Sequence, residues 1–260
     1  MELLQVLRSA TASGSIAESP LHAVAAVKAV RDAVLDGLEH VCVVRRVSGE
    51  RDVEKIIDGP EGILLARFYE DGLSKKALQR LKRSGRHLPL YRIHATIDLP
   101  IATIHDDASA DDIPDSLHHQ VVRPIAASEA EILAASMRFL AQQAHATIVV
   151  QEQSLPSGLA RACDALVRKN RSPHFLLGSR PDLADLADEM GLGTCFLSGV
   201  FGDSLFLLPE KGLFCDRYVA HEIRCQIDHT PESLQITAEE YVGLFAKDRN
   251  AVYHVRVGGQ

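Results

Sequence analysis

The chain has 260 residues, of which 46% are hydrophobic and 24% charged, and this ordinary globular composition excludes wholesale disorder. Its formal net charge of −7 excludes a global basic field that would hold a nucleic acid. No run approaches the roughly 18 apolar residues that span a bilayer, and the first residues lack the basic flank of a signal peptide. Five cysteines without a Cys-x-x-Cys pair fit a reducing compartment, so we expect a cytoplasmic origin.

The first 50 residues predict an arm, a helix and a strand. Residues 1–20 carry much Ser, Thr, Gly and Ala and predict an arm with little core of its own. Four apolar residues then recur at helical spacing: Val27, Val30, Val34 and Leu38. This pattern predicts an amphipathic helix that ends near Gly37. The apolar run 41–47 predicts a strand, closed by a turn at 48–50.

Residues 61–105 predict two strands separated by a projecting loop. The β-like runs are 63–66 and 91–97. The polar stretch between them holds a group of cations: Lys75, Lys76, Arg80, Lys82, Arg83 and Arg86. Because so long a charged segment cannot contribute to a core, we expect it to project from the sheet. A group of acids follows the second strand: Asp106, Asp107, Asp111, Asp112 and Asp115.

The clearest predicted helix covers 128–147. Ser128 and Glu131 have the spacing of a capping box, and acidic side chains favour the start of a helix. A stripe of apolar residues follows at spacings of four, three and four: Leu133, Met137, Leu140 and Ala144. We expect Met137 to pack in the core and not to contact a cofactor.

The chain after Pro156 predicts a compact α/β region. Helices are expected at 159–166 and from Pro181 to Gly191, with a short strand at 174–177 between them. Residues 209–212 predict a turn between two apolar runs, 205–208 and 213–215.

The C-terminal end predicts β-structure. Four strand-like runs are expected there: 221–226, 234–237, 240–246 and 251–257. In the last run, apolar residues alternate with Val252, His254 and Arg256, which is typical of a half-buried strand.

No catalytic or cofactor motif is present. The glycines between 191 and 202 do not match Gly-x-Gly-x-x-Gly, and the chain contains neither a phosphate-binding Gly-x-x-x-x-Gly-Lys-Ser/Thr loop nor a Gly-x-Ser-x-Gly elbow. We therefore predict no catalytic residue and no cofactor, and no residue is assigned to a metal site.

One set of residues has the side chains that bind zinc: Cys215, His221, Cys225 and His229. The set lacks the close Cys pair of structural zinc sites, and on a strand only His221 and Cys225 would share a face. Incidental thiols and histidines therefore account for it better, and the sequence leaves metal binding open. In the same way, the pair His118–His119 favours surface histidines over a pH switch, and the acidic group favours a solvated loop over a cation site.

The basic run 75–86 has three interpretations. It is a solvated loop, a nucleic-acid contact, or a contact with the acidic group 106–115 of a neighbouring subunit. No aromatic residue lies inside the run to stack on bases, which disfavours the second interpretation.

The order of these elements resembles the Hong Kong 97-type major capsid protein of tailed phages, whose fold is shared with encapsulin shells. Local likeness lies in the strand-then-helix pattern of 172–183, the glycine-flanked strand and turn of 199–212, and the two strands of 241–257. The resemblance implies an α+β, Hong Kong 97-like capsid fold with an extended loop at 63–97 and a spine helix at 128–147. The implied domains are an N-terminal arm and helix (1–40), strands and extended loop (41–105), a peripheral domain with the spine helix (106–155), an axial domain (156–228) and returning peripheral strands (229–260).

The resemblance implies a structural subunit without enzymatic activity, which self-assembles into an icosahedral capsid enclosing phage DNA. It implies a location in the virion after assembly in the host cytoplasm. The implied partners are copies of the chain in pentamers and hexamers, with scaffold, portal or decoration proteins and non-specifically held DNA, and no membrane. Two features depart from the phage pattern: the chain is short, and its loop offers no Lys–Asn crosslinking pair.

Three alternatives stay open. The first is an encapsulin-like nanocompartment shell, which suits the length of the chain. The second is an α/β enzyme or small-molecule binding domain, with 156–228 as its core and a polar pocket around Cys215, Asp216 and His221. The third is a nucleic-acid binding module that uses the basic run.

Overall fold

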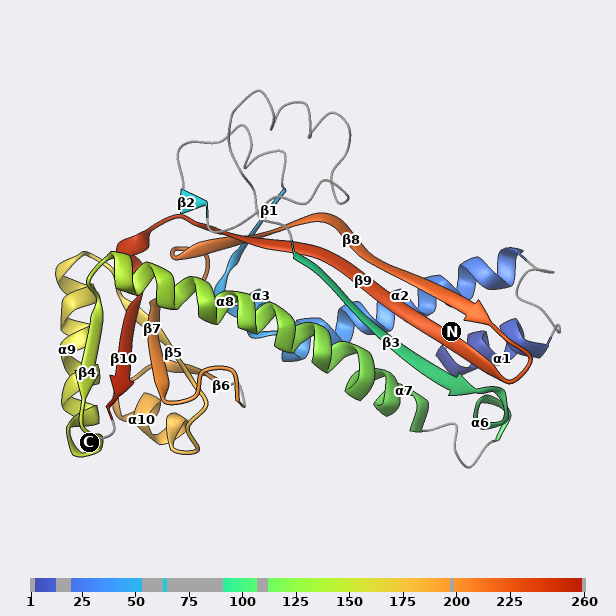
Figure 1. Cartoon of the computed structure of the whole chain (residues 1–260), viewed down its shortest axis with the longest axis horizontal. Coiled ribbons are helices and arrows are strands. Elements are labelled where there is room, and N and C mark those ends of the chain that lie inside the picture. Colours follow the sequence, from blue (N-terminus) through green and yellow to red (C-terminus); the bar gives the residue numbers. More distant parts are fainter. Residues whose placement is uncertain are drawn as a thin grey trace, which may run out of the picture. The chain divides into compact units, whose positions relative to one another are not determined.

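The computed structural model describes residues 3–12, 20–52, 63–64, 91–106, 112–196 and 199–258 (Figure 1). Contacts within the chain define two compact units. Unit 1 comprises 1–42, 91–128 and 221–241, and unit 2 comprises 43–90, 129–220 and 242–260. Both units are assembled from segments far apart in the sequence. The five predicted domain boundaries stay a prediction.

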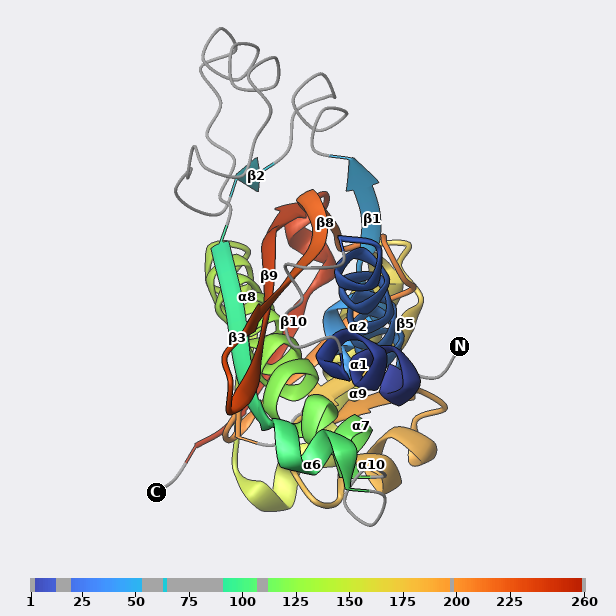
Figure 2. The same ribbon diagram turned by 90° about the vertical axis from the view of Figure 1, so that its right-hand side faces the viewer.

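The N-terminus of unit 1 is a helix, and the expectation of an arm without a core is wrong for residues 3–12. Helix α1 (Leu3–Ala12) buries Val6, Leu7 and Ala10 on one face. It packs against α2 (Pro20–Val41), beside which it lies in Figure 2. The helical spacing of these apolar residues outweighs the small polar residues that follow them.

Helix α2 confirms the predicted amphipathic pattern, but Gly37 does not end it. Val30, Val34 and Leu38 are fully buried, and the helix continues to Val41. A β-carbon at Gly37 would lie 3.0 Å from a methyl carbon of Val122. Gly37 therefore allows α2 to pack closely against Val122, and it does not end the helix.

The long helical segment starts earlier than the sequence predicts. It begins with α7 (Asp112–Leu117), continues through one π-helical turn, η3 (His118–Val122), and ends with α8 (Arg123–Gln143). Ser128 lies inside α8, so the predicted capping box is wrong. Pro124 lacks an N–H, and the widened turn just before it accommodates that loss. Met137 is fully buried in the core, as predicted.

Unit 1 also contains three neighbouring strand segments. They are β3 (Tyr91–Pro100), the second half of β8 (Cys215–His229) and the first half of β9 (Ser233–Ala246), with β9 paired to both others. The short helix α6 (Ile101–His105) follows β3. The chain forms β9 as one strand where the sequence predicts two, because residues 238–240 keep the alternation of buried and less buried side chains.

Unit 2 begins with a helix where the sequence predicts a strand. The run 41–47 is rich in valine, which favours strands, but 43–47 form α3 (Val43–Val47) with Val43, Val44 and Val47 buried. Tertiary packing therefore overrides intrinsic propensity here. Strand β1 (Gly49–Asp52) follows and pairs in parallel with β8, and β2 (Ile63–Leu64) pairs antiparallel with β9.

A second five-stranded sheet forms most of unit 2, in the order β4-β10-β7-β5-β6. The strands are β4 (Thr147–Val150), β5 (Pro173–Gly178), β6 (Gly193–Phe196), β7 (Ser204–Pro209) and β10 (Tyr253–Val257). Helices α9 (Leu155–Arg168) and α10 (Leu183–Glu189) pack on one face of it in an apolar cluster (Figure 1). The predicted helices, strand 174–177 and turn 209–212 are thereby confirmed. Short 3₁₀ turns, η4 (Glu152–Ser154) and η5 (Arg249–Ala251), precede α9 and β10.

Strand β10 departs from the predicted half-buried pattern. His254 is only 8% exposed and Val252 is fully buried, so both faces of the strand are covered at this point. Within the described ranges, no helix combines the length and the apolar character needed to cross a membrane.

We expect Leu140→Ala in α8 to lower the free energy of unfolding by about 2–5 kcal/mol, because it removes a fully buried side chain and leaves a cavity. Chemical denaturation of the purified chain measures the change. Phe139→Ala at the neighbouring position, where the side chain is 48% exposed, is the control and should cost about 1 kcal/mol or less. Equal losses in the two variants would contradict the assignment of this α8 face to the core.

Candidate functional site

The outer face of β3 and β9 in unit 1 is a polar ladder. Along β3 buried residues alternate with exposed ones, and three of the exposed polar residues, Arg92, Thr96 and Asp98, have a side-chain partner on β9. Three side-chain pairs join the strands: Arg92 donates from Nε to Glu239 Oε2 at 2.7 Å and also from Nη2, Thr96 Oγ1 lies 3.1 Å from Thr237 Oγ1, and Gln235 Nε2 donates to Asp98 Oδ1 at 2.9 Å. The one arginine of these pairs, Arg92, is matched by Glu239, so the pairs give no concentrated positive surface for a polyanion.

The zinc-like set is distributed along β8 and does not form a described cluster. Cys225 and His229 are four residues apart on this strand, or about 13 Å, whereas two ligands of one zinc ion lie about 4 Å apart. Burial raises the pKa of the Cys225 thiol to about 11, which disfavours the thiolate that would bind a metal. The side chain of His221 lies outside the described residues. Among those that are described, no three His, Cys, Asp or Glu side chains come together as a metal site.

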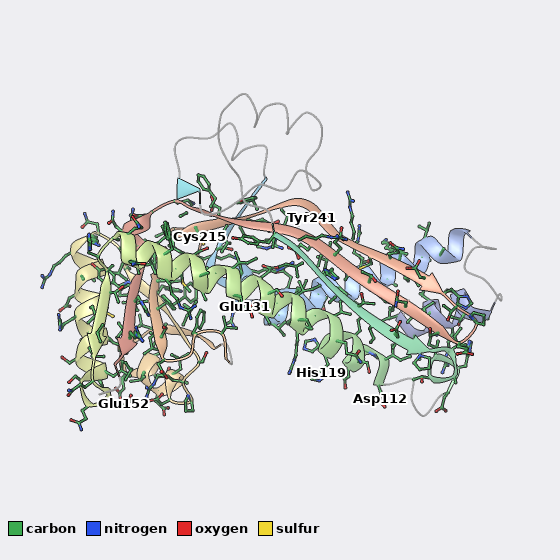
Figure 3. The ribbon with its side chains drawn as sticks, in the orientation of Figure 1. Asp112, His119, Glu131, Glu152, Cys215 and Tyr241 are labelled. Carbon is green, nitrogen blue, oxygen red and sulfur yellow. The ribbon has the colours of Figure 1, made fainter. Side chains whose placement is uncertain are left out.

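The polar pocket of the enzyme alternative centres on Cys215 and Asp216. Cys215, labelled in Figure 3, is 1% exposed, and burial followed by the nearby Asp216 carboxylate raises the pKa of its thiol. A buried neutral thiol is a poor nucleophile. Asp216 is also buried and accepts a bond from Lys247 Nζ at 3.2 Å. These groups form a packed charge pair and not an accessible pocket.

A hollow of about 430 Å³ lies on α2 in unit 1. The described residues that line it belong to this helix: Ala23, Val24, Val27, Lys28 and Arg31. These side chains include no carboxylate, hydroxyl, thiol or imidazole, so they bring no nucleophile or catalytic acid together.

Ser204 and His254 in unit 2 have the spacing of a nucleophile and its base. Ser204 Oγ lies 3.0 Å from His254 Nε2. Both residues are at least 91% buried, and the imidazole stacks on Phe206 at 4.7 Å. The charged groups that act on His254 are Arg138 and Arg256, whereas a catalytic histidine is oriented by a carboxylate. We therefore interpret the Ser204–His254 pair as part of the packed interior and not as a nucleophile with its base.

Unit 2 also contains a buried ionic cluster around Glu129 of α8. Arg217 of β8 donates from Nε to Glu129 Oε2 at 3.0 Å and from Nη2 to Oε1 at 3.3 Å. Arg45 of α3 places Nη2 3.5 Å from the same Oε1. The Glu129 side chain is 0% exposed, Arg217 6% and Arg45 9%. Buried charges are expensive unless paired, so this cluster is a strong constraint on the three elements that supply it.

Sequence reasoning missed both buried groups. It placed Glu129 near a helix start, because an acidic side chain there favours the positive end of the helix dipole. Residues 45, 129 and 217 are far apart in the chain, and no spacing rule connects them. For His254, the only available signal was its position on an alternating strand.

The remaining sequence candidates do not gather at one place. His118 and His119 lie in η3 with ring centroids 5.8 Å apart, and His119 is exposed (Figure 3). Asp112 and Asp115 are exposed in the first turn of α7, while Asp107 and Asp111 lie outside the described residues. The basic run 75–86 also lies outside them, so its three interpretations stay predictions.

No family model matches the sequence, and no curated protein matches it. Solved structures do. A virus-like particle from Pyrococcus furiosus is similar with a TM-score of 0.59 and 12% identity, over 87% of this chain and 98% of that chain. A chain from Mycobacterium phage Adephagia gives 0.53 and 10%, over 88% and 90%. A phage-related protein from Bordetella bronchiseptica RB50 gives 0.53 and 12%, over 87% and 94%. At this identity the likeness shows the fold, and it confirms the fold class predicted from the sequence.

We expect acid to destabilise unit 2 through His254. Burial, then the positive Arg138 and Arg256, lower the pKa of His254 from 6.5 to about 4 in the folded chain. An unfolded histidine binds a proton below about pH 6.5, so stability present above that pH is lost as pH falls toward 4, by about 2–3 kcal/mol. Thermal unfolding of the subunit between pH 7 and 4 measures this loss.

His254→Gln, which has no titrating group, should reduce the pH dependence, and His119→Gln at an exposed position is the matched control. An unchanged pH profile in the His254→Gln variant would contradict this role of His254.

Proposed function

We propose that this chain, which has the Hong Kong 97-like capsid fold, is a structural shell subunit that self-assembles into an icosahedral capsid enclosing phage DNA. The likeness over nearly the whole length of shell and phage proteins carries this proposal, because it covers a complete fold and not one motif. The partners are then other copies of the chain in pentamers and hexamers, with scaffold, portal or decoration proteins as further partners. The location is the virion.

Physical features of the chain support a structural role. A shell needs extensive heterologous contacts that close by symmetry. The described residues with the chemistry of a reaction centre, Asp216, His254 and Cys215, are buried, and Asp216 and His254 are also hydrogen-bonded. The net charge of −7 suits a container that releases DNA, because a basic lumen would retain it.

The predicted segments take their roles under this proposal. Residues 1–40 are the N-terminal arm and helix, 41–105 the strands and extended loop, and 106–155 the peripheral domain with the spine helix. Residues 156–228 form the axial domain, and 229–260 the returning strands. The basic run 75–86 meets the acidic group 106–115 of a neighbouring copy, a charge complementarity that fixes register and orientation between subunits.

A nanocompartment shell is the second candidate. The virus-like particle from Pyrococcus furiosus supports it, because this chain covers 98% of that chain with the highest TM-score of the three likenesses described above. A compartment of this kind would enclose protein where a capsid encloses DNA.

Expression of the chain alone should give closed particles of megadalton mass. Multi-angle light scattering measures the mass, and negative-stain microscopy of the same sample tests closure. A stable monomer or dimer at all protein and salt concentrations would contradict unaided self-assembly and favour the α/β enzyme or binding-domain alternative. The nature of the enclosed material, purified from the natural source, then separates a DNA capsid from a protein-filled compartment.

Replacing Arg80, Lys82 and Arg83 by glutamine should leave the subunit folded and reduce the assembled fraction, because it removes charge that a neighbour is proposed to meet. Size-exclusion chromatography measures assembly, and circular dichroism measures folding. The matched control replaces three exposed cations outside the run, Arg161, Arg168 and Lys211, by glutamine. Equal assembly of the two triple variants would exclude the loop from subunit contacts.

A further inference from the structure

Strands β1 and β2 of unit 2 both attach to the same sheet. Strand β1 pairs with β8 in parallel, with Gly49 opposite Asp216 and Glu50 opposite Arg217. Strand β2 pairs with β9, with Ile63 opposite Ala246. Because β8 and β9 are neighbours in this sheet, two described pieces of chain on either side of 53–62 are held by adjacent strands.

A charge pair, Asp216 with Lys247, lies at these strand pairings. Asp216, opposite Gly49, accepts a hydrogen bond from Lys247 Nζ at 3.2 Å, and Lys247 directly follows Ala246, the partner of Ile63. A β-carbon at Gly49 would lie 2.3 Å from Asp216 Oδ1. The Asp216 carboxylate thus packs directly on the backbone of β1 and links it to the end of β9.

The next residue of β8 extends the same linkage to two helices. Arg217 lies opposite Glu50, and its guanidinium pairs with Glu129 of α8 through two donors. Arg45 of α3 meets the same carboxylate from the segment that leads into β1. Backbone bonds add to this attachment, since Gly212 N donates to Val47 O at 3.0 Å.

These charges fix geometry more than they add stability. A buried ion pair roughly balances its desolvation cost against its Coulomb attraction, but a misplaced partner leaves a charge without compensation. Only arrangements that keep Glu129 between the two guanidinium groups avoid that cost. Segment 43–52, defined here as the root segment, therefore has one strongly preferred position on β8.

We propose that Glu129 and Arg217 are positioning residues for assembly, which hold the root segment in the orientation from which the following chain meets a neighbouring copy. The inference rests on the proposed shell function. It assigns to the cluster a role that core burial alone does not need, because an uncharged core would stabilise unit 2 equally well without fixing the orientation of 43–52.

The test compares Glu129→Gln and Gly49→Ala with Leu140→Ala, which removes core volume without touching the cluster. Glu129→Gln removes the shared charge, and Gly49→Ala moves β1 away from Asp216. Amide hydrogen exchange in the unassembled subunit should be faster by at least about tenfold at residues 49–52 in the first two variants, relative to Leu140→Ala. This readout does not depend on assembly.

Assembly is then compared at equal remaining stability, with temperature chosen so that each variant has the same folded fraction. Glu129→Gln and Gly49→Ala should lose most of their particles, while Leu140→Ala should keep them. Equal losses in all three, or unchanged exchange at 49–52, would overturn the positioning role. If the unchanged chain forms no particles, the shell function fails, and the exchange experiment alone decides whether Glu129 holds the root segment.

Discussion

The buried carboxylate of Glu129 is the constraint on which the organisation of unit 2 depends. Two guanidinium groups from α3 and β8 meet it inside the protein, where effective screening is weak and misplaced charge is costly. Helix α3 departs from the strand preference of its valines, and this places Arg45 beside Glu129. The apolar face of the same short helix is buried as well. Apolar packing and charge pairing therefore select the same local structure, against intrinsic propensity.

The pKa shifts of the described thiols and of His254 weaken their reactivity, because they keep the thiols protonated and make the imidazole a weaker base. Burial raises the pKa of the Cys215 and Cys225 thiols, and burial beside two arginines lowers that of His254. Enzyme sites shift pKa values toward working pH, whereas these shifts move the groups away from it. The Ser204–His254 contact illustrates the distinction, since correct spacing occurs with positive neighbours and a covered imidazole.

The sequence predicted the elements whose signal is local and strong. Helices α2 and α9, strand β5 and the turn at 209–212 follow from apolar spacing and turn residues, and the order of elements was enough to identify the fold class.

The predicted boundaries of the elements were wrong where local rules conflict with packing. The long helix begins before Pro124, which a proline rule treats as a break, and Ser128 with Glu131 imitates a cap inside it. The ionic cluster was inaccessible to such rules because residues 45, 129 and 217 meet only in the folded chain. His254 was misjudged because alternation tells which residues share a face, but not whether another element covers that face.

Charge distribution connects the fold with the proposed assembly. Some charges of the described structure already have a partner of opposite sign within the chain, as Arg92 has in Glu239 and Arg217 has in Glu129, and such pairs have less attraction left for a neighbour. The proposed contacts between copies would draw on other charges, and the sequence has two groups of opposite sign, at 75–86 and at 106–115. A heterologous contact between them joins different patches of neighbouring copies, which is the arrangement that closes into rings and shells. Under the proposed function, complementary patches on one chain would also select a single register between copies, so these two groups would supply specificity to the contact.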